Sequence, residues 1–438
     1  MTKSLKVLMG GRPAGTLTWN AGRMSFSYDE GYRSDRGAVP LSVSLPLSAA
    51  RHDHEEVSPW LWGLLPDSHR VLKSWGRRFH VKATDAFGLL GAVGTDCAGA
   101  VQFVRPEYSG WRKADREVRW LSESELGNRL DELGRGVGDG RREGDPGLFT
   151  LAGAQPKTAL LYQDGRWGVP GPGVPTNVLV KPANVHVVPG LLENEHFCLR
   201  LAQAVGLPVV RSTLLRLGAV RALVVDRYDR CVTEEGGWAR SHQEDCCQAL
   251  SVYPDRKYQN ESGPGVDAVM KLLAASHDPE NDRGTFMRAL VFNFLVAGTD
   301  AHGKNYALRL GPQGSVRLAP LYDVASFLPY ADGSKLRLAM KVGGRYHLKN
   351  TWPRHWARRA QAVGYPPGAV LDDLTGMAHM LPDLASDLLA RLGEEGVFDP
   401  VLRRLVDRLA GHCGRTLARV RAHTPGHQEE GLGHGPGV

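Results

Sequence analysis

The segment of residues 299–326, TDAHGKNYALRLGPQGSVRLAPLYDVAS, decides how the rest of the chain is arranged. It follows an apolar run at residues 287–297, which predicts a helix, and Gly298 is a natural end for that helix. A polar loop comes next, so we expect the segment to begin with a loop held at the end of a buried helix.

The second half of this segment predicts a β-hairpin. Two short extended runs, residues 306–310 and 316–320, flank the turn sequence Gly-Pro-Gln-Gly. Because a hairpin returns the chain to its starting end, we expect Asp323 to come back beside Asn305. The carboxylate of Asp300 then lies close to two further oxygen ligands.

This set of side chains matches the needs of phosphoryl transfer. One Asp orients or deprotonates the attacking hydroxyl, while an Asn and a second Asp hold Mg²⁺ on the nucleotide phosphates. In the protein-kinase catalytic loop the base Asp precedes the metal Asn by five residues, as Asp300 precedes Asn305, and the metal Asp follows one hairpin later, as Asp323 does. The His-Arg before the first Asp and the Phe-Gly after the second are missing. The alternative is that Asp and Asn only cap turns, and the rest of the chain has to decide.

Composition describes a soluble globular protein. The chain has 438 residues, enough for about two or three domains. Its net charge of +7 comes from 54 basic and 47 acidic residues, a mild excess that fits anionic partners but equally a solvated surface. The six cysteines show no CxxC pairing, and neither a signal peptide nor a membrane-spanning run is apparent. We therefore expect a cytoplasmic protein with reduced thiols and no membrane partner.

Five regions follow from the pattern of elements and breakers. We expect a β-rich N-terminal domain with a helix at residues 59–66, then a segment made of one helix at residues 122–133 and a flexible glycine-rich connector. A β-rich nucleotide-binding part, a lobe in which apolar spacing predicts helices, and a disordered tail complete the chain. The boundaries are residues 1–108, 109–146, 147–230, 231–423 and 424–438.

Two further stretches suit a nucleotide site. Residues 149–161, FTLAGAQPKTALL, place small residues ahead of a strand, where backbone N–H groups and Lys157 could approach phosphates, although a plain tight turn fits as well. Lys181 ends a predicted strand and precedes a predicted helix at residues 191–205. A strand lysine paired with a helix glutamate is a fixed part of a kinase site. Glu195 is preferred to Glu193 as its partner, and the alternative is a solvent-facing Lys181.

With these pieces placed, the sequence resembles the HipA family of serine/threonine kinases, the toxin half of HipBA toxin–antitoxin modules. The resemblance runs over nearly the whole chain. It is carried by Leu64-Leu-Pro-Asp-Ser68, Gly99-Ala-Val, Leu151-Ala-Gly-Ala-Gln-Pro-Lys-Thr-Ala-Leu, Val225-Asp-Arg-Tyr-Asp-Arg, His242-Gln-Glu-Asp-Cys-Cys-Gln-Ala-Leu, Thr299-Asp-Ala-His-Gly-Lys-Asn and Leu321-Tyr-Asp-Val-Ala-Ser.

The resemblance implies an α+β, bilobal, protein-kinase-like fold with a β-rich N-terminal part and an all-helical C-terminal lobe, which binds ATP and Mg²⁺. It makes Asp300 the catalytic base, with His302 and Lys304 beside it at the phosphates, and Asn305 and Asp323 the metal ligands. It also implies that Thr150 is the autophosphorylation site that switches the enzyme off. The remaining residues expected at the nucleotide are Ala152, Gly153, Ala154, Gln155, Lys157, Lys181, Glu195, Tyr322, and Asp226 and Tyr228 at the hinge between the lobes.

Partners and substrate follow from the resemblance alone. It implies a HipB-like helix-turn-helix antitoxin that carries the protein to operator DNA, and an aminoacyl-tRNA synthetase, notably the glutamyl type, as the phosphorylated protein. Two other functions remain open on the sequence. One is a catalytically weak co-repressor that acts with the antitoxin on DNA, and the other is a small-molecule kinase of the aminoglycoside or choline type.

Overall fold

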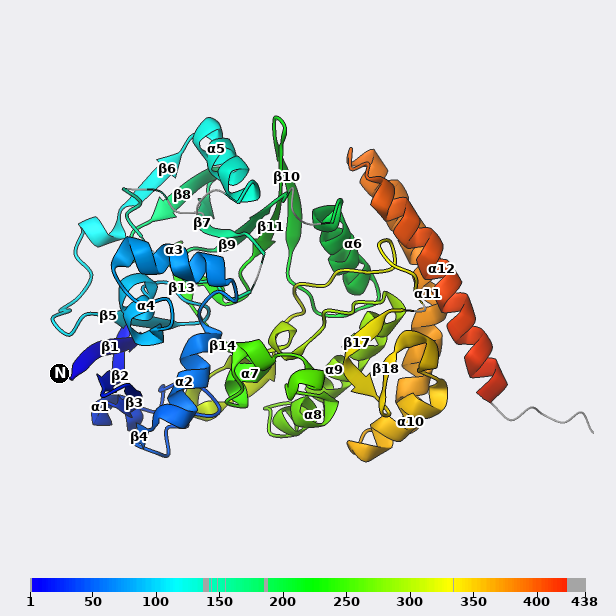
Figure 1. Ribbon diagram of the computed structural model, residues 1–438, viewed down its shortest axis with the longest axis horizontal. Helices are drawn as coiled ribbons and strands as arrows, with labels where there is room; N and C mark the ends of the chain where they lie inside the picture. The colour runs from blue at the N-terminus through cyan, green and yellow to red at the C-terminus, as the bar shows by residue number, and fades with distance from the viewer. Residues whose placement is uncertain are drawn as a thin grey trace, which may run out of the picture.

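The computed structural model describes residues 2–136, 142, 144–147, 149–153, 155–184, 188–333 and 335–423. Ala154, the predicted tail and residues 137–141 and 143 of the glycine-rich connector lie outside these residues. Figure 1 shows three parts around a common centre: an N-terminal domain, a sheet covered by α5, and a helical lobe edged by α12. None of the helices in the described ranges is both long and apolar enough to cross a bilayer.

The N-terminal domain is a five-stranded antiparallel sheet in the order β4-β3-β2-β1-β5, packed against short helices. Its helix α2 begins five residues before the predicted start at residue 59, because Glu55 and Glu56 suit the first turn of a helix and Pro59 is accommodated inside it. The elements are β1 Lys3–Met9, β2 Arg12–Asn20, β3 Arg23–Tyr28, α1 Glu30–Arg33, β4 Arg51–His52, α2 His54–Gly63, α3 His69–Phe79, α4 Ala86–Val93 and β5 Val101–Val104.

The second part is a six-stranded sheet in the order β10-β11-β9-β7-β8-β6. Helix α5 packs its Leu126 and Leu130 on one face of this sheet, so the segment expected to be a helix and connector contributes a strand and a covering helix to the nucleotide-binding part. The elements are β6 Val118–Leu121, α5 Glu123–Gly134, β7 Thr158–Gln163, β8 Arg166–Pro170, β9 Val178–Pro182, α6 Leu191–Ala204, β10 Ser212–Leu217 and β11 Val220–Asp226.

The C-terminal lobe is mainly helical and holds the largest apolar core, to which α6, α9, α11 and α12 all contribute. Three small sheets lie within it, which the expectation of an all-helical lobe did not include apart from the hairpin after residue 305. The helices are α7 Cys246–Ala249, α8 Val266–Ala274, α9 Pro279–Leu295, α10 Pro353–Ala362, α11 Pro367–Glu394 and α12 Pro400–His423, and the strands are β12 Arg230–Val232, β13 Trp238–Arg240, β14 His242–Asp245, β15 Ala307–Leu310, β16 Val316–Leu318, β17 Arg337–Val342 and β18 Arg345–His347.

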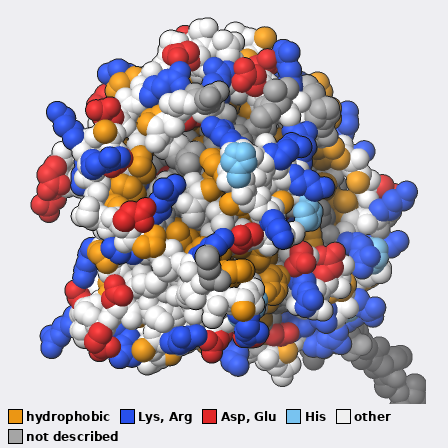
Figure 2. Space-filling view, turned by 60° about the vertical axis from the view of Figure 1, so that its left-hand side comes forward, with side chains coloured by type: hydrophobic (Ala, Val, Ile, Leu, Met, Phe, Trp, Pro, Cys, Tyr) orange, Lys and Arg blue, Asp and Glu red, His pale blue; other side chains and the backbone are white. Residues whose placement is uncertain are grey.

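Charged side chains of both signs are mixed on the face shown in Figure 2, where Lys and Arg side chains are scattered with acidic side chains among them. This face is therefore not a continuous basic patch.

Candidate active site

The catalytic loop begins where α9 ends. Ala297 adopts a left-handed conformation with φ 52°, and the N–H of Gly298 donates to the carbonyl of Asn293 at 2.7 Å. This is the hydrogen-bond pattern of a Schellman helix end, with Ala297 at the position usually taken by glycine. Gly298 is needed for space instead, since a Cβ there would lie 2.2 Å from the side-chain oxygen of Asn293. The sharp end aims the chain from the buried helix into the polar loop.

The hairpin after the loop brings Asp323 back to Asn305, as the sequence predicts. Strands β15 and β16 pair antiparallel, and the side-chain nitrogen of Asn305 donates to the backbone carbonyl of Asp323 at 3.4 Å. Asp323 itself has φ 53°, a left-handed conformation that costs a non-glycine residue free energy and occurs preferentially at functional sites. Because the amide nitrogen of Asn305 is engaged, its amide oxygen is left to bind a cation.

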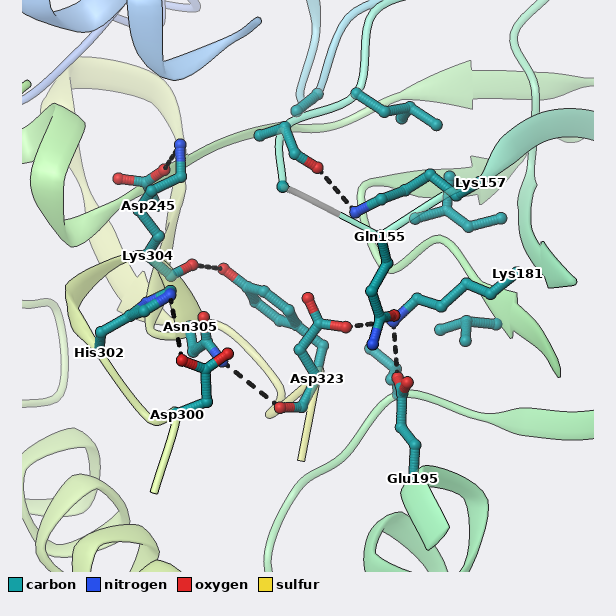
Figure 3. A pocket seen from close by; sticks show the side chains of 18 of the residues that line it. Gln155, Lys157, Lys181, Glu195, Asp245, Asp300, His302, Lys304, Asn305 and Asp323 are labelled. Atoms are coloured by element: carbon teal, nitrogen blue, oxygen red, sulfur yellow. Dashed lines mark hydrogen bonds and ion pairs between the residues drawn. The ribbon is translucent and has the colours of Figure 1, made fainter. Parts of the chain in front are cut away.

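Lys181 lies at the centre of the site, between two carboxylates. Its ammonium donates to Glu195 on α6 at 2.7 Å and also to the carboxylate of Asp323 (Figure 3). Burial alone would lower the pKa of Lys181, but the two carboxylates outweigh burial and raise it. Burial likewise opposes ionisation of Asp323, yet the positive charge of Lys181 and then of Lys157 holds its pKa well below the usual range. Lys181 and Asp323 are therefore both charged near neutral pH.

Helix geometry separates the two candidate glutamates. Glu193 lies two residues from Glu195, which puts it on another side of α6, and its carboxylate pairs with Arg221 at 2.7 Å. Arg221 is 46% exposed, whereas Lys181 is 5% exposed. The structure thus places Glu195 in the site, while Glu193 is buried outside it beneath the half-exposed Arg221.

The small-residue loop lines the same cavity. The Lys157 ammonium donates to the carbonyl of Ala152 at 2.7 Å, and Gly153 has φ 101°, which only glycine adopts readily. Gln155 also lines the cavity, while the expectation for Ala154 falls outside the described residues. Thr150 precedes this loop but is fully buried, and its hydroxyl donates to the carbonyl of Leu64 at 2.6 Å.

Asp300 is the exposed carboxylate of the catalytic loop. Its side chain is 53% exposed and accepts a hydrogen bond from the Tyr258 hydroxyl, with the Nε2 of His302 4.0 Å away. Burial lowers the pKa of His302 to about 4, although the charge of Asp300 acts in the opposite direction. His302 is consequently neutral at pH 7, and it cannot form a full ion pair with Asp300.

Lys304 points away from Asp300 and toward the N-terminal domain. Its ammonium lies 3.4 Å from a carboxylate oxygen of Asp67 and 3.6 Å from Asp245, while Lys257 binds the other oxygen of Asp67 at 2.9 Å. No catalytic residue was expected in the N-terminal domain, yet Asp67 lines the cavity. The only signal that could have indicated it was its place in the motif Leu64–Ser68.

The predicted hinge lies at the end of β11. Tyr228 lines the cavity, and its ring stacks on Tyr322 with centroids 5.9 Å apart. The backbone N–H groups of Asp226 and Arg227 are bonded to the carbonyls of Arg211 and Asn177, so these two donors are not free to bind a purine. The aromatic pair offers a base a surface for stacking.

Charges buried behind the hinge hold it in place. Arg227 and Arg230 pair with Asp229, and both reach Asp96 of the N-terminal domain, with the Arg230 guanidinium 2.9 Å from Asp96. Burial would raise the pKa of Asp96, but the surrounding guanidinium groups lower it far below the usual range. The motif Val225-Asp-Arg-Tyr-Asp-Arg is therefore largely a structural clamp.

All predicted site residues inside the described ranges, except Thr150, line one cavity of about 260 Å³. Among the described residues, no group of three or more His, Cys, Asp or Glu could hold a metal by itself. One carboxylate (Asp323) and one amide (Asn305) form an oxygen donor set that suits Mg²⁺, which usually completes its shell with phosphate and water. The residues present fit Mg²⁺ bound together with a nucleotide.

Comparison with known proteins gives consistent matches. Residues 149–385 match the family described as HipA-like C-terminal domain, and residues 5–104 match the HipA N-terminal domain. The protein named "Putative kinase Y4mE" of Sinorhizobium fredii is 33% identical over 93% of this chain and 97% of its own length. The serine/threonine-protein kinase toxin HipA of Shewanella oneidensis is 26% identical over 89% of this chain and 90% of its own. HipA of Shewanella oneidensis MR-1, solved with HipB and its operator DNA, superposes with a TM-score of 0.81 at 25% identity, covering 95% of this chain and 98% of that one.

Proposed function

Because this chain belongs to the HipA family of serine/threonine kinases, we propose that it transfers the γ-phosphoryl group of ATP to a serine or threonine hydroxyl of a protein, with Mg²⁺, as the toxin of a toxin–antitoxin module. The observation that carries the chemical part is the position of Lys181, held between Glu195 and Asp323 in the cavity that also contains Asp300.

Four side chains of the cavity then have defined roles in the transfer. Lys181 presents a fixed positive charge to the α and β phosphates, and Asn305 and Asp323 provide the oxygen ligands for Mg²⁺. Bound Mg²⁺ supplies charge neutralisation at the phosphates. Asp300 accepts the proton of the attacking hydroxyl and orients it, a task that needs an accessible carboxylate. The exposed side chain of Asp300 meets this need.

The test of this proposal is transfer from labelled ATP by the purified chain. We expect Mg²⁺-dependent transfer that falls by about 10²–10⁴-fold in Asp300→Asn, while the variant still binds ATP. Asp255→Asn, which alters an exposed carboxylate on the neighbouring surface, is the matched control and keeps full activity. A wild-type chain that binds no ATP, or an Asp300→Asn variant as active as the wild type, would exclude the proposed mechanism.

The metal ligands are tested separately. Replacement of Asp323 by Asn removes the charge that binds both Mg²⁺ and Lys181, so the Mg²⁺ concentration needed for half-maximal transfer rises. Asn305→Ala raises it as well, since an amide oxygen is lost. If transfer by both variants saturates at the wild-type Mg²⁺ concentration, these two residues are not the ligands.

The toxin role is supported by the relative from Shewanella oneidensis, which bears that name and was solved with HipB and operator DNA. We expect this chain to bind a HipB-like helix-turn-helix antitoxin, and operator DNA through it. Family membership supports an aminoacyl-tRNA synthetase of the glutamyl type as substrate. Expression of the wild type and of Asp300→Asn, followed by comparison of phosphorylated serine and threonine sites, tests this. A synthetase site that appears equally with both would exclude it.

Self-phosphorylation at Thr150 is the proposed off-switch. The buried Thr150 hydroxyl donates to Leu64, so residues 149–153 have to leave this position before the hydroxyl can reach Asp300. A phosphothreonine carries about two negative charges and cannot return to a buried contact with a carbonyl oxygen. The loop that contains Gly153 would then stay out of the cavity. Mass spectrometry that finds the phosphoryl group on another residue would exclude this switch.

A further inference from the structure

A short segment between α7 and α8 crosses beside the catalytic loop. It contains the 3₁₀ helices Pro254–Arg256 and Gln259–Glu261, and Tyr258 lies between them. The Tyr258 hydroxyl donates to Oδ1 of Asp300, and its ring packs edge-on against His302 with centroids 4.9 Å apart. None of the expectations from the sequence included Tyr258.

Both sides of Tyr258 are anchored. The carbonyl of Lys257 accepts from the N–H of Gly303 at 3.2 Å, and the Lys257 ammonium binds Asp67 at 2.9 Å. On the other side, the Gln259 side chain accepts from the N–H of Lys341 at 2.7 Å. A tyrosine held at both neighbours presents its hydroxyl in one place.

We propose that Tyr258 is a positioning residue for the Asp300 carboxylate, which it holds by one oxygen so that the other can meet the acceptor hydroxyl. The inference rests on the proposed kinase function. Asp300 is half exposed and lies on a loop, where a carboxylate would otherwise sample several rotamers. A fixed donor on one oxygen removes that freedom before the acceptor binds, and pre-orientation of this kind contributes directly to rate.

Protonation states are consistent with this role. Burial first, and then the hydrogen bond and charge of Asp300, raise the pKa of Tyr258 above its usual range, so the hydroxyl stays a donor at all assay pH values. The pKa of about 4 leaves His302 neutral. The other charged groups that act on this cluster are Lys257, Lys304, Asp67 and Glu261.

The transfer step itself needs no change at Tyr258. The acceptor oxygen forms a bond to the γ phosphorus as the bond from that phosphorus to the ADP oxygen breaks. ADP leaves with that electron pair, and the acceptor proton passes to Asp300. Tyr258 keeps its own proton throughout, so it acts through Asp300 and does not touch the reacting atoms.

The test compares Tyr258→Phe with Tyr253→Phe. The first substitution keeps the ring against His302 and removes only the hydroxyl. Tyr253 belongs to the same segment, and its hydroxyl donates to Ser58 at 3.0 Å instead of to Asp300, so its variant is the matched control. The assays are phosphoryl transfer from labelled ATP to dephosphorylated casein and phosphate release to water, each analysed for kcat and for the KM of ATP.

We expect kcat of Tyr258→Phe to fall by about tenfold with an unchanged KM for ATP and an unchanged melting temperature. Tyr253→Phe keeps the wild-type kcat.

Three results would overturn the inference: a wild-type kcat in Tyr258→Phe, a higher kcat, which would make Tyr258 an obstruction, or an equal loss in both variants. If the wild-type chain neither transfers nor releases phosphate, the proposed function fails, and the inference fails with it. An active wild type with an unaltered Tyr258→Phe rejects the inference alone.

Discussion

Replacement of Glu195 by Gln tests the centre of the site. Glu195 and Lys181 are 3% and 5% exposed, and their charged atoms are 2.7 Å apart, so this is a buried ion pair. Gln keeps the size and one acceptor oxygen but removes the charge. Lys181 then has a single carboxylate partner, Asp323, and is drawn toward the proposed Mg²⁺ ligand.

The magnitude follows from burial. Removal of one partner from a buried pair costs about 3–5 kcal/mol, and since Asp323 and the retained amide oxygen compensate in part, we expect a loss of about 2 kcal/mol in the free energy of unfolding. If a similar amount is lost from stabilisation of the transition state, kcat/KM for ATP falls about 30-fold.

Helix α6 provides the control for this experiment. Glu193→Gln makes the same chemical change two residues away, in an ion pair of the same 2.7 Å length whose other partner, Arg221, is 46% exposed. Because Arg221 is largely solvated whereas Glu193 is 6% exposed, we expect this variant to lose about 1 kcal/mol in the free energy of unfolding and to keep nearly full activity. Urea unfolding and steady-state kinetics give both quantities. Equal effects of the two substitutions, or wild-type kcat/KM in Glu195→Gln, would refute the assignment of Glu195.

Three further predictions concern other parts of the molecule. Asp67→Asn leaves Lys257 without its carboxylate partner while Lys304 keeps Asp245, so the free energy of unfolding falls by about 1–2 kcal/mol. The exposed Asp53→Asn leaves it unchanged in the same urea titration. Thr150→Ser is phosphorylated faster than the wild type, as followed by mass spectrometry, because the removed methyl group restricts rotation about χ1. Burial lowers the pKa of four histidines from 6.5 to about 4, so between these pH values the unfolded state binds protons that the folded state does not. Stability therefore falls as pH falls through that window, by up to about 1.4 kcal/mol per pH unit for each histidine, and a flat urea-unfolding profile from pH 7 to 4 would contradict this. The four are His196, His242, His302 and His412.

Features set by nearby residues could be predicted from the sequence. The hairpin after Asn305 is fixed by a turn sequence between two extended runs, and it necessarily returns Asp323 to the loop. The strand that ends near Lys181 and the helix that follows could be read from apolar spacing and end signals in the same way. The choice of Glu195 over Glu193 depended on the side of the helix that faces the strand, which the structure supplies.

Contacts between distant segments could not be predicted in this way. The pair between Lys257 and Asp67 joins residues 190 positions apart, and nothing local to either residue indicates the other. Tyr258 lies in a segment of two short 3₁₀ helices with no periodic pattern, so its position over Asp300 depends on how neighbouring elements pack. Short strands such as β6 were missed for a related reason: all four of its residues are partly buried, which leaves no alternation to detect.

The N-terminal domain forms part of the site, because it contacts three of the segments that line the cavity. Asp67 binds Lys304 of the catalytic loop, and the carbonyl of Leu64 accepts a hydrogen bond from Thr150, just ahead of the small-residue loop that contains Gly153. Asp96 compensates the buried Arg230 behind the hinge. These contacts fall on the catalytic loop, the small-residue loop and the hinge, that is, on both sides of the cavity. Separation of the domain would take one carboxylate partner each from the buried Lys304 and Arg230, which keep Asp245 and Asp229, at a cost of about 1–2 kcal/mol each. Any movement that opens the cavity must therefore either carry this domain along with one side or break its contacts with the other.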